Sequence, residues 1–156
     1  MHAAAAQVLD ELDPATTIVN IGATPEGIGA VYALATERGF RTTGIVSTQA
    51  RAYGAALSPC AGAVFYVEDE SWGGFMDDGE QLSPTSKAMV TVSDLMIGIG
   101  GGEVGRDELL AAKRDGREVR FVPAEMNHRI AIEKASKRGQ PAPTDFAGAA
   151  GKAFSK

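Results

Sequence analysis

Sulfur and imidazole side chains are scarce in this sequence. Its 156 residues include one cysteine, Cys60, and two histidines, His2 and His128. A single cysteine excludes an internal disulfide framework and any cysteine-rich metal site. Two histidines that lie far apart in the chain do not form a zinc-binding pattern. We therefore expect no metal site and no resident cofactor, and we interpret Cys60 as a packing residue.

Basic residues and long apolar runs are also lacking. The 15 Lys and Arg residues are outnumbered by 20 Asp and Glu residues, which gives a formal net charge of -5. This balance argues against a nucleic-acid polymer as the main partner. No apolar run approaches the ~18 residues that a membrane span requires. Residues 1–14 contain no Lys or Arg, unlike a secretory signal. These absences predict a cytoplasmic protein with no membrane partner.

Segments with strand and helix character alternate along the chain. With 44% hydrophobic and 22% charged residues, the composition is that of an ordinary globular protein, and its length suits one domain, 1–156. Strands are expected at 17–21, 42–47, 63–67, 95–99 and 118–122. Helices are expected at 3–12, 30–38, 48–57, 84–92, 106–114 and 125–138. This alternation predicts an α/β fold with a parallel sheet of about five or more strands and helices on both faces.

Three consecutive glycines follow the fourth expected strand. Gly100, Gly101 and Gly102 end the apolar run 95–99, and Gly105 comes shortly after them. Without Cβ atoms in the way, such a turn can point N–H groups and the positive end of the next helix at a phosphate. A tight connection that binds nothing is the alternative.

A second glycine turn follows the first expected strand. Its candidate ligand-binding residues are Gly22, Thr24, Gly27 and Gly29. Ligands of parallel α/β sheets bind at the carboxyl ends of the strands, and both glycine turns lie at such ends. Their convergence predicts a site for a small phosphorylated, nucleotide-like ligand.

Two long segments fall outside the strand–helix alternation. Residues 68–84 carry six carboxylates, no basic residue and the only tryptophan, Trp72, and we call this segment the acidic loop. A loop of this length is usually a lid or a disordered excursion. Its carboxylates could bind a divalent cation, but a solvated acidic loop is the commoner explanation. Residues 140–156 form a tail of uncertain order.

Asn127 and His128 follow the fifth expected strand and open the last expected helix. At a strand's carboxyl end they could touch a ligand. A polar pair at the start of a helix is more often a cap.

A short-chain dehydrogenase is one family to weigh for the first glycine turn. The turn is one residue longer than the dehydrogenase pattern, and the next strand ends in Ser47 without the acidic residue that holds a ribose. None of the three tyrosines is followed by a lysine four positions later. We therefore set this interpretation aside.

Two segments of the chain together resemble the "lonely guy" family of phosphoribohydrolases, proteins once labelled lysine decarboxylases. The first runs from Val19 through the glycine turn to Val46, and the second from Ser86 to Leu109. They stand in the family's order, and the resemblance covers roughly 19–122. It implies a Rossmann-like fold, in a superfamily that also includes molybdenum-cofactor carrier proteins, and a homodimer.

The sequence departs from the family at four points. The family's arginine position is Ser86, although Lys87 follows as in the family. The proline of its Pro-Gly-Gly loop is Gly100, and its Gly-Thr step becomes Gly105-Arg106 after one extra residue. The family's first strand has no counterpart before Thr17, and the acidic loop is additional.

The family cleaves the N-glycosidic bond of a nucleoside 5′-monophosphate, using a carboxylate that stabilises an oxocarbenium-like transition state. The resemblance assigns catalytic roles to Glu108 and Lys87. Arg106 is a candidate for binding phosphate from the glycine turn. Glu108 could instead complement the helix dipole, and both cations could be solvated. Two functions stay open: a phosphoribohydrolase, or a non-catalytic carrier or sensor of a nucleotide or molybdopterin-like cofactor.

Overall fold

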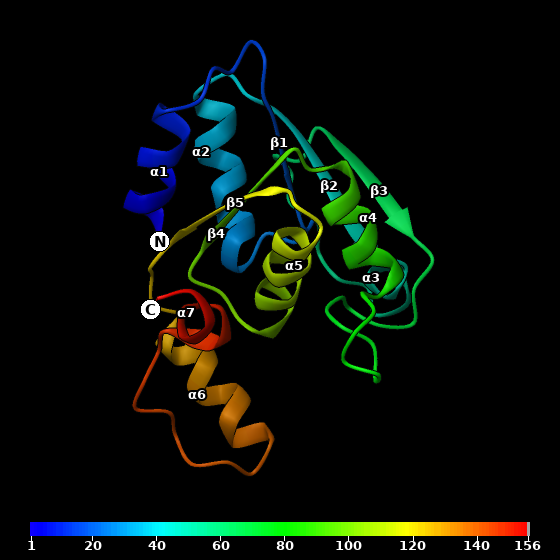
Figure 1. Ribbon diagram of the computed structural model, residues 1–156, viewed down its shortest axis with the longest axis vertical. Helices are drawn as coiled ribbons and strands as arrows, with labels where there is room; N and C mark the ends of the chain where they lie inside the picture. Colours follow the sequence, from blue (N-terminus) through cyan, green and yellow to red (C-terminus); the bar gives the residue numbers. More distant parts are fainter. Residues whose placement is uncertain (156) are drawn as a thin grey trace.

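The computed structural model describes residues 1–155 as an α/β fold (Figure 1). Its strands are β1 Ile18–Ile21, β2 Arg41–Ser47, β3 Ala63–Val67, β4 Leu95–Ile99 and β5 Glu118–Val122. Its helices are α1 His2–Asp10, the short 3-10 helix η1 Gly27–Ala30, α2 Val31–Glu37, α3 Gln49–Ala52, α4 Pro84–Val92, α5 Glu103–Arg114, α6 His128–Lys137 and α7 Gly148–Phe154. Among the residues described, no helix is long and apolar enough to cross a membrane.

The strands are parallel and form two hydrogen-bonded groups. β2 lies between β1 and β3, and β4 pairs with β5. The predicted α/β class and parallel strand direction are confirmed, but the ladders join three strands and two strands rather than five in one sheet. Residues 44–47 of β2 are all buried, although successive side chains point to opposite faces. This pattern is typical of a central strand that is covered on both sides.

An apolar cluster brings the ends of β1 and β4 to the same region. Its buried members are Ala5, Leu9, Val31, Ala35 and Phe40. Ile21 and Ile99, the last residues of β1 and β4, both pack against this cluster. The two glycine turns therefore leave the strands from neighbouring positions in the fold.

The hydroxyl group of Tyr32 on α2 links β1 to β2 close to the first glycine turn. The side chain is fully buried, and its hydroxyl lies 2.9 Å from the Ile21 carbonyl and 2.7 Å from that of Thr43. Burial raises the pKa of Tyr32 to about 12, and its hydrogen bond to Ile21 only partly opposes this rise. The hydroxyl therefore stays protonated and can donate to either strand. Gly44 leaves room for it, because a Cβ there would lie 2.9 Å from the Tyr32 oxygen.

Several helices begin or end elsewhere than the sequence predicts, and the cause is visible for α3 and α6. α3 covers only 49–52 of the expected 48–57, because Gly54 has a φ of +60° that ends the helix. α6 begins at 128 rather than 125, because Asn127 caps it: its Oδ1 accepts a hydrogen bond of 3.1 Å from the N–H of Ile130. Asn127 is therefore a helix cap, which is the more common role of a polar residue at the start of a helix.

The tail from 140 onward contains helix α7, which the sequence did not predict. The N–H of Ala150 donates to the carbonyl of Gly101 at 3.1 Å, and the Phe121 and Phe154 rings stack at 5.5 Å. Ala150 is fully buried. α7 thus packs on the second glycine turn and on β5, whereas the neighbouring α6 has no buried residue and lies at one end of the molecule (Figure 1).

Gly148 and Gly139 provide a matched test of this docking. Both have positive φ, +71° and +64°, but only a Cβ on Gly148 would overlap the Gly101 carbonyl, whereas nothing lies within 4 Å of one on Gly139. Gly148→Ala should therefore lower the free energy of unfolding by about 1–3 kcal/mol more than Gly139→Ala. Urea denaturation of both variants measures the difference. Equal losses would show that α7 is not docked on the glycine turn.

Candidate functional site

Close backbone packing accounts for the first glycine turn. A Cβ on Gly29 would overlap the Thr24 carbonyl oxygen, and Gly27 has a φ of +60°. The short helix η1, which contains both glycines, therefore packs directly on the Thr24 carbonyl. Gly22 is half-buried, and a Cβ there would meet no atom within 4 Å, so the space beside it is open.

The second glycine turn leads directly into α5. Gly100 and Gly101 have φ values of +59° and +123°, and a Cβ on Gly100 would overlap the Ala124 carbonyl. Because two glycines absorb this turn, α5 begins at 103 rather than at the predicted 106, so Gly105 lies inside its first turn. Internal packing alone requires glycine at position 100, and no ligand is needed to explain it.

The first turn of α5 has free hydrogen-bond donors. Gly102 is the N-cap residue and makes no side-chain cap bond. Within residues 1–155, the first backbone donor of the helix with an acceptor is Arg106, whose N–H bonds to the Gly102 carbonyl at 3.0 Å. The N–H groups of the three preceding residues, 103–105, remain available, and Glu103 and Val104 are exposed. Together with the helix dipole, these donors favour an anion at this end of α5.

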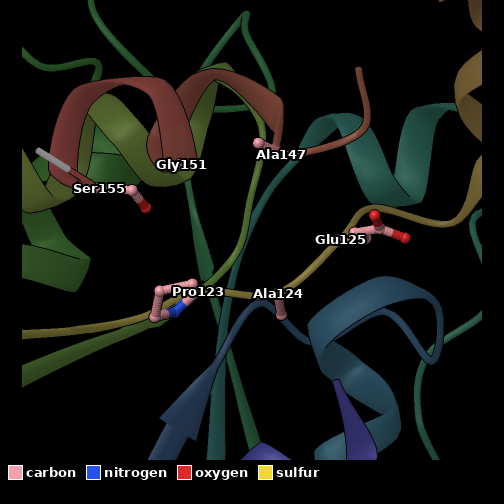
Figure 2. A pocket seen from close by; sticks show the side chains of 6 residues that line it. All are labelled: Pro123, Ala124, Glu125, Ala147, Gly151 and Ser155. Carbon is pink, nitrogen blue, oxygen red and sulfur yellow. The ribbon is translucent and has the colours of Figure 1, made fainter. Parts of the chain in front are cut away.

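An open hollow lies beside the end of β5 (Figure 2). Its volume is about 350 Å³ and its lining is mostly small side chains, from Pro123, Ala124, Glu125, Ala147, Gly151 and Ser155. Glu125 accepts a hydrogen bond of 2.8 Å from His128, whose ring stacks on Phe146 at 3.7 Å. The His128 ring therefore interacts with Glu125 and Phe146.

The predicted catalytic cation, Lys87, and the predicted phosphate-binding cation, Arg106, lie on different helices, α4 and α5. Lys87 is exposed on α4 and has no ion pair among the described residues. Arg106 bonds to the next residue, Asp107, with its Nε at 2.8 Å and an Nη at 2.7 Å from Oδ1. The Arg106 guanidinium is therefore paired with Asp107 rather than free.

Glu108 lies in a polar cluster with Ser86 of α4. Ser86 is fully buried, and its hydroxyl donates to Glu108 Oε1 at 2.6 Å while it accepts from the N–H of Gly74 at 2.8 Å. Burial raises the pKa of Glu108 from 4.5 to about 7, the charge of Asp107 adds to this rise, and the Ser86 hydrogen bond opposes it. The carboxyl group is therefore partly protonated near neutral pH, which is common for residues at functional sites.

The acidic loop is tied to α4 and α5 by two buried aspartates. Asp69 Oδ2 accepts from the N–H of Thr85 at 2.9 Å, and Asp107 Oδ2 accepts from the N–H of Phe75 at 3.0 Å. Burial alone would raise the pKa of Asp69, but hydrogen bonds from Thr85 and Ser71 outweigh it and lower the pKa to about 2. These contacts hold the base of the loop, which its acidic composition did not indicate.

A second open hollow, of about 560 Å³, separates the acidic loop from the outer face of α5. The side chains of Phe75, Met76, Val104 and Leu110 give it apolar walls, and Glu103, Arg106 and Asp107 line it as well. No group of three or more His, Cys, Asp or Glu side chains suited to a metal ion occurs in the part of the chain that the structure describes. Two carboxylates of the loop accept hydrogen bonds from its own backbone: Asp69 from the N–H of Ser71, and Asp78 from the N–H groups of Glu80 and Gln81.

Comparison with models of protein families, with curated proteins and with solved structures gave no match for the chain. Relationship to any family therefore depends on the sequence resemblance alone.

Glu108 makes the stability of the protein depend on pH near neutrality. Its pKa is higher in the folded chain, so the folded state holds more protons and loses stability as the pH rises from about 4.5 to about 7. Between pH 5 and pH 8 the loss should reach about 2 to 3 kcal/mol. In Glu108→Gln this loss should disappear.

Urea unfolding at several pH values measures both proteins. Glu103→Gln, which changes an exposed carboxylate on the same helix, should follow the wild type. A wild-type profile as flat as that of Glu108→Gln would show that Glu108 titrates normally.

Proposed function

We propose that the protein binds a small phosphorylated, nucleotide-like ligand at the carboxyl ends of β1 and β4, with the phosphate at the first turn of α5. The observation that carries the proposal is the exposed start of this 12-residue helix, where three N–H groups have no acceptor and no side chain caps the end. Helix termini of this kind bind phosphate through N–H groups and the helix dipole.

The arrangement of the strands supports this location. Because Ile21 and Ile99 pack on the same cluster, the open space beside Gly22 and the start of α5 are both near this cluster. We propose that β1 and β4 lie next to each other as in a Rossmann-like doubly wound fold, in which ligands bind where the strand order reverses. Membership of the wider Rossmann-like nucleotide-binding superfamily that includes the "lonely guy" family, and the homodimer that the resemblance implies, are parts of the same proposal.

Backbone donors, rather than cations, would hold the phosphate. Asp107 neutralises Arg106, and Lys87 is exposed on another helix. A backbone site lacks the bidentate alignment that an arginine provides. This difference favours a carrier or sensor over an enzyme, because catalysis requires that the ribose and phosphate be held in one orientation.

A phosphoribohydrolase is the second candidate, and Glu108 favours it. A carboxyl group with a pKa of about 7 could act as acid or base near neutral pH. In the structure, however, the Ser86 hydroxyl occupies its Oε1, and Gly74 lies on the other side of that hydroxyl. Hydrolysis would therefore require the acidic loop to move away from Glu108.

Thermal unfolding with phosphate, AMP, ADP and ATP tests the proposal, and adenine release from AMP distinguishes the two candidates. A ligand at ~100 times its dissociation constant should stabilise the fold by about 2.7 kcal/mol. Binding without adenine release indicates a carrier or sensor. Release that disappears in Glu108→Gln, while binding persists, indicates a hydrolase. Absence of stabilisation by all four ligands would contradict the proposed function.

Two substitutions of Glu103 test whether the phosphate binds to the start of α5. Proline is tolerated at the first position of a helix, and Gly102 before it is extended, with φ −89° and ψ −155°. Glu103→Ala and Glu103→Pro both remove the acidic side chain, but only the proline removes an N–H donor. Phosphate or AMP should bind about 5- to 10-fold more weakly to Glu103→Pro than to Glu103→Ala, as expected for one lost hydrogen bond. Equal affinities would place the anion elsewhere.

A further inference from the structure

Strand β3 has one edge without a neighbouring strand. It is the outer strand of the group β1-β2-β3, and it lies at the edge of the molecule (Figure 1). The carbonyl of Val67 accepts from the N–H of Thr48 at 2.9 Å, so the main-chain groups of Val67 face β2. Because these groups alternate in direction along a strand, those of Val64 and Tyr66 face away from β2. Among the described residues, no other strand pairs with β3, so these N–H and C=O groups lack a main-chain partner.

The sequence of β3 does not protect this edge from further pairing. Edge strands usually carry a lysine, a proline or a bulge that blocks another strand. Residues 52–67 contain no charged side chain, their one proline, Pro59, lies outside the strand, and the register with β2 has no bulge. Phe65, in the middle of the strand, is 57% exposed. This edge can therefore accept another strand.

The exposed Phe65 ring lies on the face of the sheet that α4 covers. Asn20 of β1 approaches α4, with its Nδ2 3.2 Å from the sulfur of Met89, and it accepts a hydrogen bond of 3.0 Å from the Thr43 hydroxyl. Thr43 therefore points to the α4 face, as does Ile45 two residues later, and Ile45 pairs with Phe65. Since more than half of the Phe65 side chain is exposed, α4 leaves much of this ring uncovered.

We propose that β3 pairs with β3 of a second copy of this chain, in antiparallel direction about a twofold axis at Phe65. Val64 of each copy then lies opposite Tyr66 of the other, and each such pair exchanges two hydrogen bonds between the groups that face outward. The two Phe65 rings lie opposite each other in a non-hydrogen-bonded pair, where aromatic side chains stabilise a sheet. This register matches the whole of β3, whose middle residue is Phe65.

The distribution of charge favours contact between two copies at this edge. The chain has a net charge of -5, so two copies repel each other over much of their surface. Residues 52–67 are the longest stretch without a charged side chain. The first carboxylate after β3, Glu68, lies opposite Gly62 of the other copy in the proposed register, so no two carboxylates are paired. The inference gives an interface to the homodimer of the proposed function and rests on that homodimer, but not on ligand binding.

Cysteine cross-linking tests the register. In a Cys60→Ser background, Phe65→Cys should form a disulfide-linked dimer under mild oxidation, because the Cα atoms of a non-hydrogen-bonded pair lie about 4.5 Å apart, within disulfide range. Ala63→Cys, on the same face, is the matched control. Each Ala63 lies opposite Val67 of the other copy, so the two positions are offset by about 13 Å along the strands and should not cross-link. Equal cross-linking, or none in Phe65→Cys, would overturn the proposed pairing.

Molar mass in solution, measured by light scattering over a range of concentrations, tests the interface without a cross-link. The wild type should be a dimer. Phe65→Lys places two like charges opposite each other and should raise the dissociation constant of the dimer about 100-fold or more. Ile132→Lys, which introduces the same charge at an exposed position on α6, should leave the dissociation constant unchanged.

Two substitutions of Val64 keep the test valid if Phe65→Lys does not fold. Both Val64→Pro and Val64→Ala shorten the side chain, but only proline removes the outward N–H, a change that edge strands tolerate. Val64→Pro should therefore weaken the dimer about 10-fold relative to Val64→Ala. A dimer that neither Phe65→Lys nor Val64→Pro weakens would overturn the β3 interface and leave the homodimer standing. A monomeric wild type would overturn both, and the AMP-binding measurements would be independent of either result.

Discussion

One buried hydroxyl group holds together three parts of this molecule that are distant in the sequence. Ser86 on α4 accepts a hydrogen bond from the acidic loop at Gly74 and donates one to Glu108 on α5. If the Ser86 hydroxyl were removed, a Gly74 N–H or Glu108 carboxyl group left buried without a hydrogen bond would lower the free energy of unfolding by about 1–3 kcal/mol. The serine also explains a departure from the resembled family, because a fully buried position beneath Gly73 and Gly74 has no room for the family's arginine.

Most of the secondary structure could be predicted from local patterns. All five strands lie within one residue of their expected bounds, because each is a short apolar or β-branched run with glycine, proline or polar residues near its ends. The division of the strands into two hydrogen-bonded groups could not be predicted, since no local pattern specifies which strand edges meet. Helix α7 was missed for a similar reason. Its short sequence of small residues shows no local helix pattern, and the helix is held by contacts with Gly101 and Phe121, which are distant in the sequence.

The candidate site was predicted less completely than the fold. The positive φ values of Gly27, Gly100 and Gly101 agree with the predicted turns, although close backbone packing accounts for part of this glycine requirement. Predicted roles for Lys87 and Arg106 depended on the family pattern, which does not show that Arg106 pairs with Asp107. The anchoring of the acidic loop was missed because its bonds to Ser86 and Asp107 join residues 12 and 32 positions apart.

The proposed phosphate site lies next to the contacts between the acidic loop and α5. The free N–H groups of residues 103–105 precede Asp107, which accepts from the N–H of Phe75, by about one helical turn. A titration of the ¹⁵N-labelled protein with AMP, followed by the amide resonances, tests the proposed site most directly. The account predicts that the largest shifts occur at 102–105 and around the turn 22–29. Shifts confined to other parts of the chain, or none at millimolar AMP, would contradict it.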